Sequence, residues 1–329
     1  MYITWLKAQD VGLLELAGPA AVVAARSRDG GRTFSRPLRV SDPSRERVGA
    51  ASPVIDSDGD LVVLYEDFKD DRRDFQNLEG PPWKSPFSLV VTRPVGDRGF
   101  SQAVPVDEDV VPTRRFLVFL PEFPSLAAGP GNTLYAAWSD GRNGDEDVFL
   151  RRSDDDGRTW TAAERVNDNP RADGTSQYLP RVDVAPDGRV DVLYLDRRRD
   201  RRNVMTDATL ASSSDEGGSF QTTRLSSRSF DSRVGASAGE RLPVDFGSRL
   251  GLASADGRSL AAWTDTRLGS VDTGRQDVFS AVYEPPGSRG GLARDALIGA
   301  LLILAAAFAV LAARGRRPVA RTDAQRPSH

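Results

Sequence analysis

Four short segments of this chain place an aspartate two residues before a basic side chain. The pairs are Asp67 with Lys69, Asp140 with Arg142, Asp196 with Arg198 and Asp265 with Arg267. An aspartate and an arginine at this spacing can form charge-assisted hydrogen bonds with each other, and a guanidinium group can also clamp the carboxylate of a ligand. Because the pair recurs, the pattern favours a structural brace, and contact with a ligand is the alternative.

Two long polar segments combine aromatic and arginine side chains. Residues 66–87 contain Trp83, and residues 106–123 contain Arg114 and Arg115. Aromatic rings offer a flat stacking surface for a sugar, and guanidinium groups bind acidic substituents through paired hydrogen bonds. These residues predict a site for a sugar or an anionic glycan. The alternative is that they only pack the two segments against the protein.

The composition excludes several kinds of chemistry. The chain has no cysteine, and its one histidine is His329 at the end of a polar tail. Disulfides, thiolate zinc sites, cysteine nucleophiles and histidine triads are therefore excluded. No cofactor or metal is expected; clustered aspartates would suit Ca²⁺, but no EF-hand spacing is present. The net charge of −3 argues against a nucleic-acid partner, because such proteins present a basic surface.

A recurring eight-residue turn indicates how the chain is organised. Its shared positions are Ser27, Asp29, Gly31, Thr33 and Phe34 in the first copy, Ser153, Asp155, Gly157, Thr159 and Trp160 in the second, and Ser213, Asp215, Gly217 and Phe220 in the third. The aspartate can accept hydrogen bonds from nearby amides, and the glycine supplies a left-handed backbone conformation. The aromatic residue is expected to begin a strand and to pack inward. We therefore interpret these residues as structural.

The spacing of the turns predicts a repeated sheet. With a degenerate turn near residues 96–100 included, the turns recur about every sixty residues, enough for the four strands of a propeller blade. Five apolar stretches that end in an aromatic residue align with this period: residues 1–5, 61–65, 134–138, 190–194 and 260–263. The first unit lacks an innermost strand, and the fifth stops after residues 278–283 and lacks the strand that follows the turn in the other units.

The turn, Ser-x-Asp-x-Gly-x-Thr-Trp/Phe, resembles the Asp box (BNR repeat) of sialidases and related propellers, and the resemblance covers roughly residues 1–283. It implies an all-β, sialidase-like β-propeller with five recognisable blades. We expect an incomplete six-bladed ring whose remaining strands lie upstream, and a ring of five is the alternative. In that family the Asp boxes lie away from the active site, so the aspartate–base pairs would lie on the opposite, ligand-binding face.

The resemblance leaves catalysis open. Sialidases hold the substrate carboxylate with three arginines and use a tyrosine nucleophile assisted by a glutamate, with an aspartate as acid/base. That set cannot be placed here, and the early Arg-Ile-Pro motif of the family is absent. Tyr178 is the one tyrosine that falls in a predicted connection between blades. A glycosidase that uses two carboxylates could draw on Asp70, Asp71, Asp140 or Asp196.

The C-terminal region predicts a membrane anchor. Residues 296–313 are apolar and uncharged and are followed by Arg314, Arg316 and Arg317. At about 1.5 Å per residue this stretch nearly spans a bilayer core of about 30 Å, and a basic flank stays cytoplasmic. The expected order is a propeller over 1–284, a linker over 285–295, a transmembrane helix over 296–313 and a cytoplasmic tail over 314–329. No export signal is recognisable at the start of the chain.

Two functions remain from the sequence. The first is a bacterial, membrane-tethered propeller outside the cytoplasm that recognises, or also hydrolyses, glycans. The second is a non-catalytic propeller that binds another protein at the cell surface. Oligomeric state is not indicated by the sequence.

Overall fold

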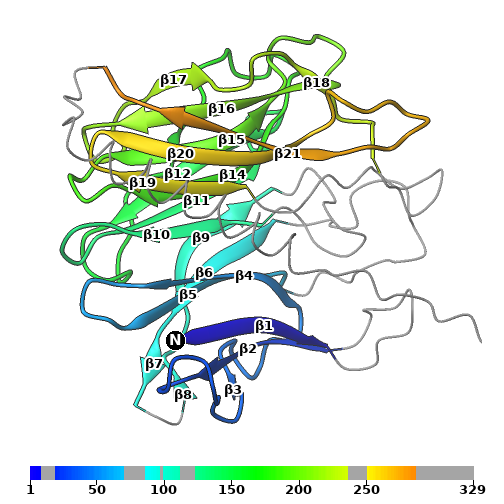
Figure 1. The fold of residues 1–329 in the computed structure, drawn as a ribbon. Coiled ribbons are helices and arrows are strands. Elements are labelled where there is room, and N and C mark those ends of the chain that lie inside the picture. The colour runs from blue at the N-terminus through cyan, green and yellow to red at the C-terminus, as the bar shows by residue number, and fades with distance from the viewer. Residues whose placement is uncertain (9–18, 70–85, 97–98, 112–122, 236–249, 287–329) are drawn as a thin grey trace, which may run out of the picture. The chain divides into compact units, whose positions relative to one another are not determined.

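A computed structural model describes residues 1–8, 19–69, 86–96, 99–111, 123–235 and 250–286. The chain divides into a unit from Met1 to Pro285, which contains every described strand, and a unit from Pro286 to His329. The described residues are all-β and contain no helix (Figure 1). Among them there is accordingly no apolar helix of membrane-spanning length, and the stretch 296–313 lies outside them.

The strands form five main antiparallel sheets, which we number 1 to 5 in chain order. Sheet 1 contains β1 (Tyr2–Ala8), β2 (Ala20–Arg26) and β3 (Leu38–Arg39). Sheet 2 contains β4 (Val48–Ile55), β5 (Leu61–Asp67), β6 (Phe87–Thr92) and β9 (Val104–Val110), with the small hairpin β7 (Pro94–Val95) and β8 (Gly99–Phe100) beside it. Sheet 3 contains β10 (Ser125–Ala128), β11 (Leu134–Asp140), β12 (Asp147–Ser153) and β13 (Glu164–Arg165).

The last two sheets follow the same plan. Sheet 4 contains β14 (Gln177–Val184), β15 (Val190–Asp196), β16 (Met205–Ser213) and β17 (Gln221–Arg224), and β18 (Phe230–Asp231) also pairs with β16. Sheet 5 contains β19 (Gly251–Ala255), β20 (Arg258–Asp265) and β21 (Asp277–Tyr283). The five aromatic-ended stretches of the sequence are β1, β5, β11, β15 and β20, as predicted.

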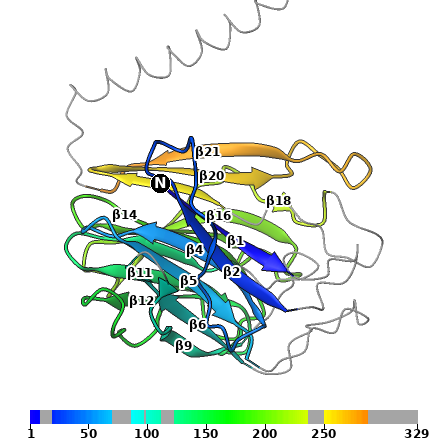
Figure 2. The ribbon, with the colours of Figure 1, turned by 90° about the horizontal axis from the view of Figure 1, so that it is seen from below.

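Consecutive sheets pack face to face, which is why their strands are apolar on both sides. Four core clusters fill the spaces between sheets 1 and 2, 2 and 3, 3 and 4, and 4 and 5. Within β15, for example, Tyr194 packs toward sheet 3 and Leu193 packs toward sheet 5. Because successive side chains of a strand point to opposite faces, the two neighbouring sheets bury both faces of an inner sheet. Figure 1 shows sheet 1 at the bottom, sheet 2 above it and sheet 3 above sheet 2, and Figure 2 shows the same strands from below.

The two end sheets have three strands each within the described residues. Their pairing identifies β1, β2 and β3 as equivalents of the second, third and fourth strands of sheet 2, so none of the described residues forms an innermost strand of sheet 1. Sheet 5 has equivalents of the first three strands, and residues 250–286 contain no fourth. Both gaps agree with the sequence prediction.

The three aspartate turns share one set of hydrogen bonds. In the second copy, Asp155 accepts bonds from the Thr159 amide at 2.8 Å and the Thr159 hydroxyl at 2.7 Å, and the Ser153 hydroxyl accepts a bond from the Gly157 amide at 2.8 Å. Gly157 has a φ of +81°, as the turn requires. The equivalent bonds close the turns at Asp29 and Asp215.

The aromatic residues of these turns differ from the prediction in two ways. Trp160 and Phe220 pack against the cores on the preceding-sheet side, but Phe34 is 39% exposed. The equivalent space beside sheet 1 contains no preceding sheet among the described residues. Trp160 also does not begin a strand, because β13 starts only at Glu164.

Candidate ligand-binding face

The aspartates of the four pairs lie at one end of the sheets. Asp67, Asp140, Asp196 and Asp265 are the last residues of β5, β11, β15 and β20. We call this the Asp/Arg end. The aspartate turns follow the third strands and therefore lie at the opposite end, as the sequence predicts for an antiparallel sheet.

Asp140 and Arg142 form a pair whose carboxylate is fully enclosed. Asp140 is fully buried; its carboxylate accepts bonds from the Trp138 indole at 2.9 Å and from the Arg142 Nε at 2.8 Å. The Arg142 guanidinium continues to Asp107, on β9 of sheet 2, at 3.1 Å, and lies 4.8 Å from the centre of the Phe149 ring. Arg142 therefore ties sheet 3 to sheet 2.

The next two pairs make the same kind of link. Arg198 lies 2.5 Å from Asp196 through its Nε, and it also forms an ion pair with Asp168, which follows the last strand of sheet 3. Arg267 lies 2.5 Å from Asp265 and donates a bond of 2.6 Å to Ser227, which follows β17 of sheet 4. Each arginine reaches from its own sheet to the sheet before it.

The first pair differs from the others. Asp67 is bound by Arg45, from the connection between sheets 1 and 2, at 2.7 Å. Lys69 instead donates a bond of 2.7 Å to the Glu108 carbonyl of its own sheet. Asp67 is therefore also linked toward the preceding sheet, but its basic partner is Arg45 and not Lys69.

Electrostatics at this end are governed by burial. Burial raises the pKa of Asp140 and of Asp196, and the neighbouring guanidinium groups oppose that rise. Each arginine neutralises the charge of its aspartate. Removing either partner would therefore leave the charge of the other without a counterpart. These geometries match the structural interpretation of the pairs, and their contact with a ligand remains a prediction.

The tyrosines at this end do not have the properties of nucleophiles. Tyr178 does not lie in a connection between blades, as the sequence suggested, but in β14; its hydroxyl accepts a bond of 3.0 Å from buried Arg197. The prediction was wrong because β14 continues through a bulge at Leu179, whose φ is +58°. Burial raises the pKa of Tyr65 to about 12 and also raises that of Tyr194.

Several predicted residues lie outside the part of the chain that the structure describes. They are Trp83, Arg114, Arg115, Asp70 and Asp71. Their proposed roles are therefore those of the sequence analysis alone. Among the described residues, no group of three or more acidic or histidine side chains is placed to hold a metal ion.

One feature of this end was not recognised from the sequence. Residues 197–204, Arg-Arg-Arg-Asp-Arg-Arg-Asn-Val, join β15 to β16 directly after Asp196. We call this segment the arginine turn. Asp200 at its centre accepts bonds from the amides of Arg202 at 3.1 Å, Val204 at 3.1 Å and Met205 at 2.8 Å. The backbone of the turn is thereby fixed from within.

The arginine turn is also anchored to the neighbouring strand. Asn203, with a φ of +56°, accepts a bond of 2.9 Å from the Ser176 amide and donates one of 3.0 Å to the Ser176 hydroxyl. Ser176 immediately precedes β14. The amide of Arg197 also donates a bond of 3.0 Å to the Ser176 carbonyl. The turn is therefore held at both ends.

Three guanidinium groups of the arginine turn reach solvent. Arg199 and Arg202 have side chains that are 60% and 78% exposed, and Arg201 is exposed as well. Arg199 lies 3.8 Å from Asp207 and Arg202 lies 3.6 Å from Asp200, which are long distances for ion pairs. Exposed ion pairs of this kind contribute at most about 1 kcal/mol, so these cations can be shared with a ligand at little cost.

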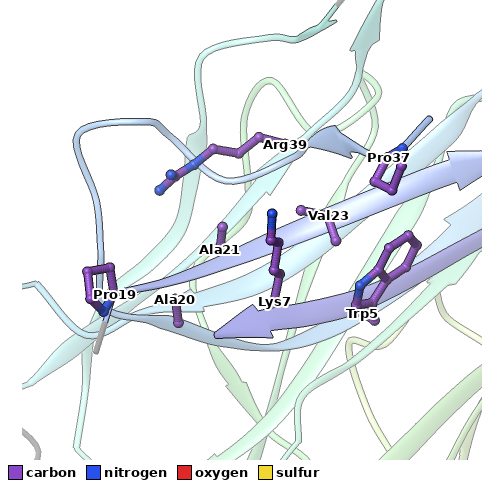
Figure 3. Close-up of a pocket in the computed structure, with 8 residues that line it drawn as sticks. All are labelled: Trp5, Lys7, Pro19, Ala20, Ala21, Val23, Pro37 and Arg39. Atoms are coloured by element: carbon purple, nitrogen blue, oxygen red, sulfur yellow. The ribbon is translucent and has the colours of Figure 1, made fainter. Parts of the chain in front are cut away.

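A separate pocket of about 430 Å³ lies on sheet 1. It is lined by Trp5, Lys7, Pro19, Ala20, Ala21, Val23, Pro37 and Arg39 (Figure 3). Its cations and indole would suit an acidic sugar. However, residues at the position of Trp5 in the other sheets are covered by the preceding sheet, so we interpret the pocket as part of a packing surface.

No protein-family model and no curated protein matches this chain. Similar solved structures include a protein of unknown function from Dyadobacter fermentans, at 17% identity and a TM-score of 0.49, covering 83% of this chain and 73% of that one. A Hadza microbial sialidase shows 14% identity and a TM-score of 0.42, covering 83% and 55%. An α-L-arabinanase of Penicillium chrysogenum shows 16% identity and a TM-score of 0.45, covering 80% and 85%. At these values the likenesses carry no argument about activity or ligand.

Proposed function

We propose that this chain recognises anionic glycans without hydrolysing them, and that the arginine turn makes the contacts. One observation carries the proposal: a turn fixed by Asp200 and Ser176 presents the guanidinium groups of Arg199, Arg201 and Arg202 to solvent. A fixed turn loses little conformational freedom on binding, and guanidinium groups match carboxylate and sulfate groups through paired hydrogen bonds.

Recognition without turnover is supported by the state of the other ionisable groups at this end. Asp140, Asp196 and Asp265 are buried and bound to arginines. Tyr65 and Tyr194 hold their protons more tightly than a free tyrosine does. A glycosidase needs a carboxyl group or nucleophile that can reach substrate, and these described groups are engaged within the protein.

The proposed setting is the outer surface of a membrane, with residues 296–313 as the anchor. It is supported by the eighteen-residue apolar stretch and the arginines that follow it. An anchored protein could hold a polyanionic chain near the surface through contacts of modest strength.

The proposal is tested by calorimetric titration of the full chain, in a mild non-ionic detergent, with size-fractionated heparin oligosaccharides. Replacing Arg199, Arg201 and Arg202 by Gln should weaken binding by about ten- to a hundredfold, since each exposed charge contact contributes about 0.5–1 kcal/mol. Binding should also weaken as salt rises, because solvent-exposed charges are screened.

A matched variant separates a specific site from general attraction. Arg32, Arg36 and Arg158 are exposed and belong to, or follow, the aspartate turns. Replacing these three by Gln removes the same charge and should leave heparin affinity unchanged. Equal losses of heparin affinity in the two variants, or unchanged affinity after replacement of Arg199, Arg201 and Arg202, would refute the proposed site. Uncharged dextran should not bind to either protein.

A further inference from the structure

A second turn lies beside the arginine turn, at the same end of the sheets. Residues 169–175, Asn-Pro-Arg-Ala-Asp-Gly-Thr, belong to the connection from β13 of sheet 3 to β14 of sheet 4, and we call them the Pro-Arg turn. Sheets 3 and 4 are inner sheets, and each has a neighbouring sheet packed on both of its faces. The two turns therefore lie at an inner boundary between sheets and not on the outward face of sheet 1 or sheet 5.

The arginine turn is attached to the chain on both sides of the Pro-Arg turn. Arg198 forms an ion pair with Asp168, the residue before the Pro-Arg turn. Asn203 is hydrogen-bonded to Ser176, the residue after it. Both ends of the Pro-Arg turn are therefore held against the arginine turn, and Arg171 lies between these two points of attachment.

Hydrogen bonds also fix the Pro-Arg turn itself. Asp173 accepts bonds from the Thr175 amide at 2.8 Å, from the Thr175 hydroxyl at 2.6 Å and from the Asn169 side chain at 2.9 Å. The Gly174 amide donates a bond of 2.8 Å to Asp145, in the connection between β11 and β12 of sheet 3. Like the arginine turn, this turn is fixed before a ligand arrives and loses little conformational freedom on binding.

The Pro-Arg turn adds a cation to those of the arginine turn. Arg171 is exposed and has no hydrogen-bond or ion-pair partner for its side chain among the residues that the structure describes, and the same is true of Arg201. Asp207 lies 3.8 Å from Arg199 but is bound more closely by Arg224, at 2.7 Å. The charges of Arg171, Arg199 and Arg201 are therefore available to a ligand.

We propose that Arg171 is a further contact residue for the anionic glycan, and that the two turns together bind a chain of several acidic sugars and not a single acidic sugar. This inference rests on the proposed function. Like charges repel, so unpaired guanidinium groups stay apart. A carboxylate or sulfate group accepts charge-assisted hydrogen bonds at about 2.7–2.9 Å. One acidic group therefore engages one or two of these cations, and the remaining cations require further acidic groups on the same chain.

The test measures the affinity of the full chain for a heparin disaccharide and for a heparin octasaccharide, by calorimetric titration in a mild non-ionic detergent. Arg171→Gln should weaken octasaccharide binding by about two- to fivefold, the effect of one exposed charge contact. It should leave disaccharide binding unchanged, because the arginine turn alone binds the shorter ligand. The melting temperature should also stay unchanged, because the Arg171 side chain has no partner among the described residues.

Arg36→Gln is the matched control, because Arg36 is also exposed and follows the first aspartate turn, at the opposite end of the sheets. Its affinities for both ligands should equal those of the wild type. Unchanged octasaccharide affinity in Arg171→Gln, equal losses for the two ligands, or equal losses in the two variants would overturn the inference. The variant that lacks Arg199, Arg201 and Arg202 decides the proposed function separately, and a wild-type chain that binds no octasaccharide would overturn both.

Discussion

At the scale of single residues, the structure shows why an acid and a base recur at one position. Asp140 is fully buried, and a buried carboxylate is costly unless its hydrogen bonds are satisfied. Trp138 and Arg142 satisfy it, and Arg142 also reaches Asp107 of the preceding sheet. The Arg142 amide donates a hydrogen bond to the Asp140 carboxylate and so closes the turn between the two residues. The spacing of two residues lets the Arg142 guanidinium contact the same carboxylate.

Removing the Asp140 carboxylate should strongly destabilise the fold. Asp140→Ala leaves Arg142 with half its partners and Trp138 without its acceptor, so we expect a loss of about 3 kcal/mol in the free energy of unfolding, measured with urea. Asp154→Ala is the control: Asp154 is 54% exposed in a surface pair with Arg152, and its loss should cost less than about 1 kcal/mol. Equal costs for the two variants would contradict the proposed brace.

Glycines with the same backbone conformation should differ in their tolerance of alanine. Gly217 and Gly59 have φ values of +90° and +85°. A Cβ at position 217 would lie 2.6 Å from Leu150, whereas a Cβ at position 59 would meet nothing within 4 Å. Both alanine variants should lose about 1 kcal/mol through backbone strain, and Gly217→Ala should lose about 1–3 kcal/mol more through overpacking. Thermal unfolding that shows equal losses would argue against this packing of the third turn.

At the scale of elements, innermost strands are linked across sheets by serine hydroxyls. The Ser52 hydroxyl accepts a bond of 3.2 Å from the Leu126 amide, and the Ser125 hydroxyl accepts one of 3.1 Å from the Val182 amide. Both bonds are buried. They fix the offset of one sheet against the next where no backbone ladder runs between them.

Ser125→Ala should therefore cost about 1–3 kcal/mol, because the Val182 amide would remain buried without an acceptor. Ser35→Ala removes the same kind of bond, to the Arg26 amide, in an exposed position. Water can replace the hydroxyl there, so the loss should be below about 0.5 kcal/mol. Urea unfolding of the two variants checks the difference, and similar losses would mean that the cross-sheet bonds contribute little.

The elements were largely predictable because their signals are local. A short apolar run that ends in an aromatic identifies β1, β5, β11, β15 and β20, and the serine–aspartate–glycine pattern identifies the turns. Tyr178 was misplaced because a bulge extends β14 into a polar segment that looks like a connection. Phe34 was misjudged because its burial depends on a neighbouring sheet, which a pattern within one unit does not report.

At the scale of the whole molecule, the site was harder to predict than the fold. The arginine turn is visible in the sequence as a run of arginines after Asp196, yet only the hydrogen bonds of Asp200 and Asn203 distinguish a fixed turn from a solvated loop. Conversely, Arg142, Arg198 and Arg267 were candidate ligand contacts, and their partners in the preceding sheets could not be read from a spacing.

Acid should destabilise the whole molecule in a defined window. Asp29, Asp155, Asp200 and Asp215 have pKa values of about 2 against an ordinary value of 3.8, chiefly because hydroxyl or amide groups donate hydrogen bonds to them. A lowered pKa stabilises the fold above the unfolded value and loses that contribution as pH falls through the folded value. The melting temperature should therefore fall as pH decreases from about 4 to about 2, and Asp155→Asn should reduce the decrease. A flat profile over this range would contradict the assignment.

Recognition without hydrolysis is tested most directly by assaying one preparation of the full chain for both activities. The chain is incubated with a panel of fluorogenic glycosides, including a sialoside and an arabinoside, and the same sample is titrated with heparin oligosaccharides. We predict saturable heparin binding that depends on Arg199, Arg201 and Arg202, with no release of fluorophore above a blank. Enzymatic release from any glycoside, or absence of heparin binding by the folded chain, would contradict the account.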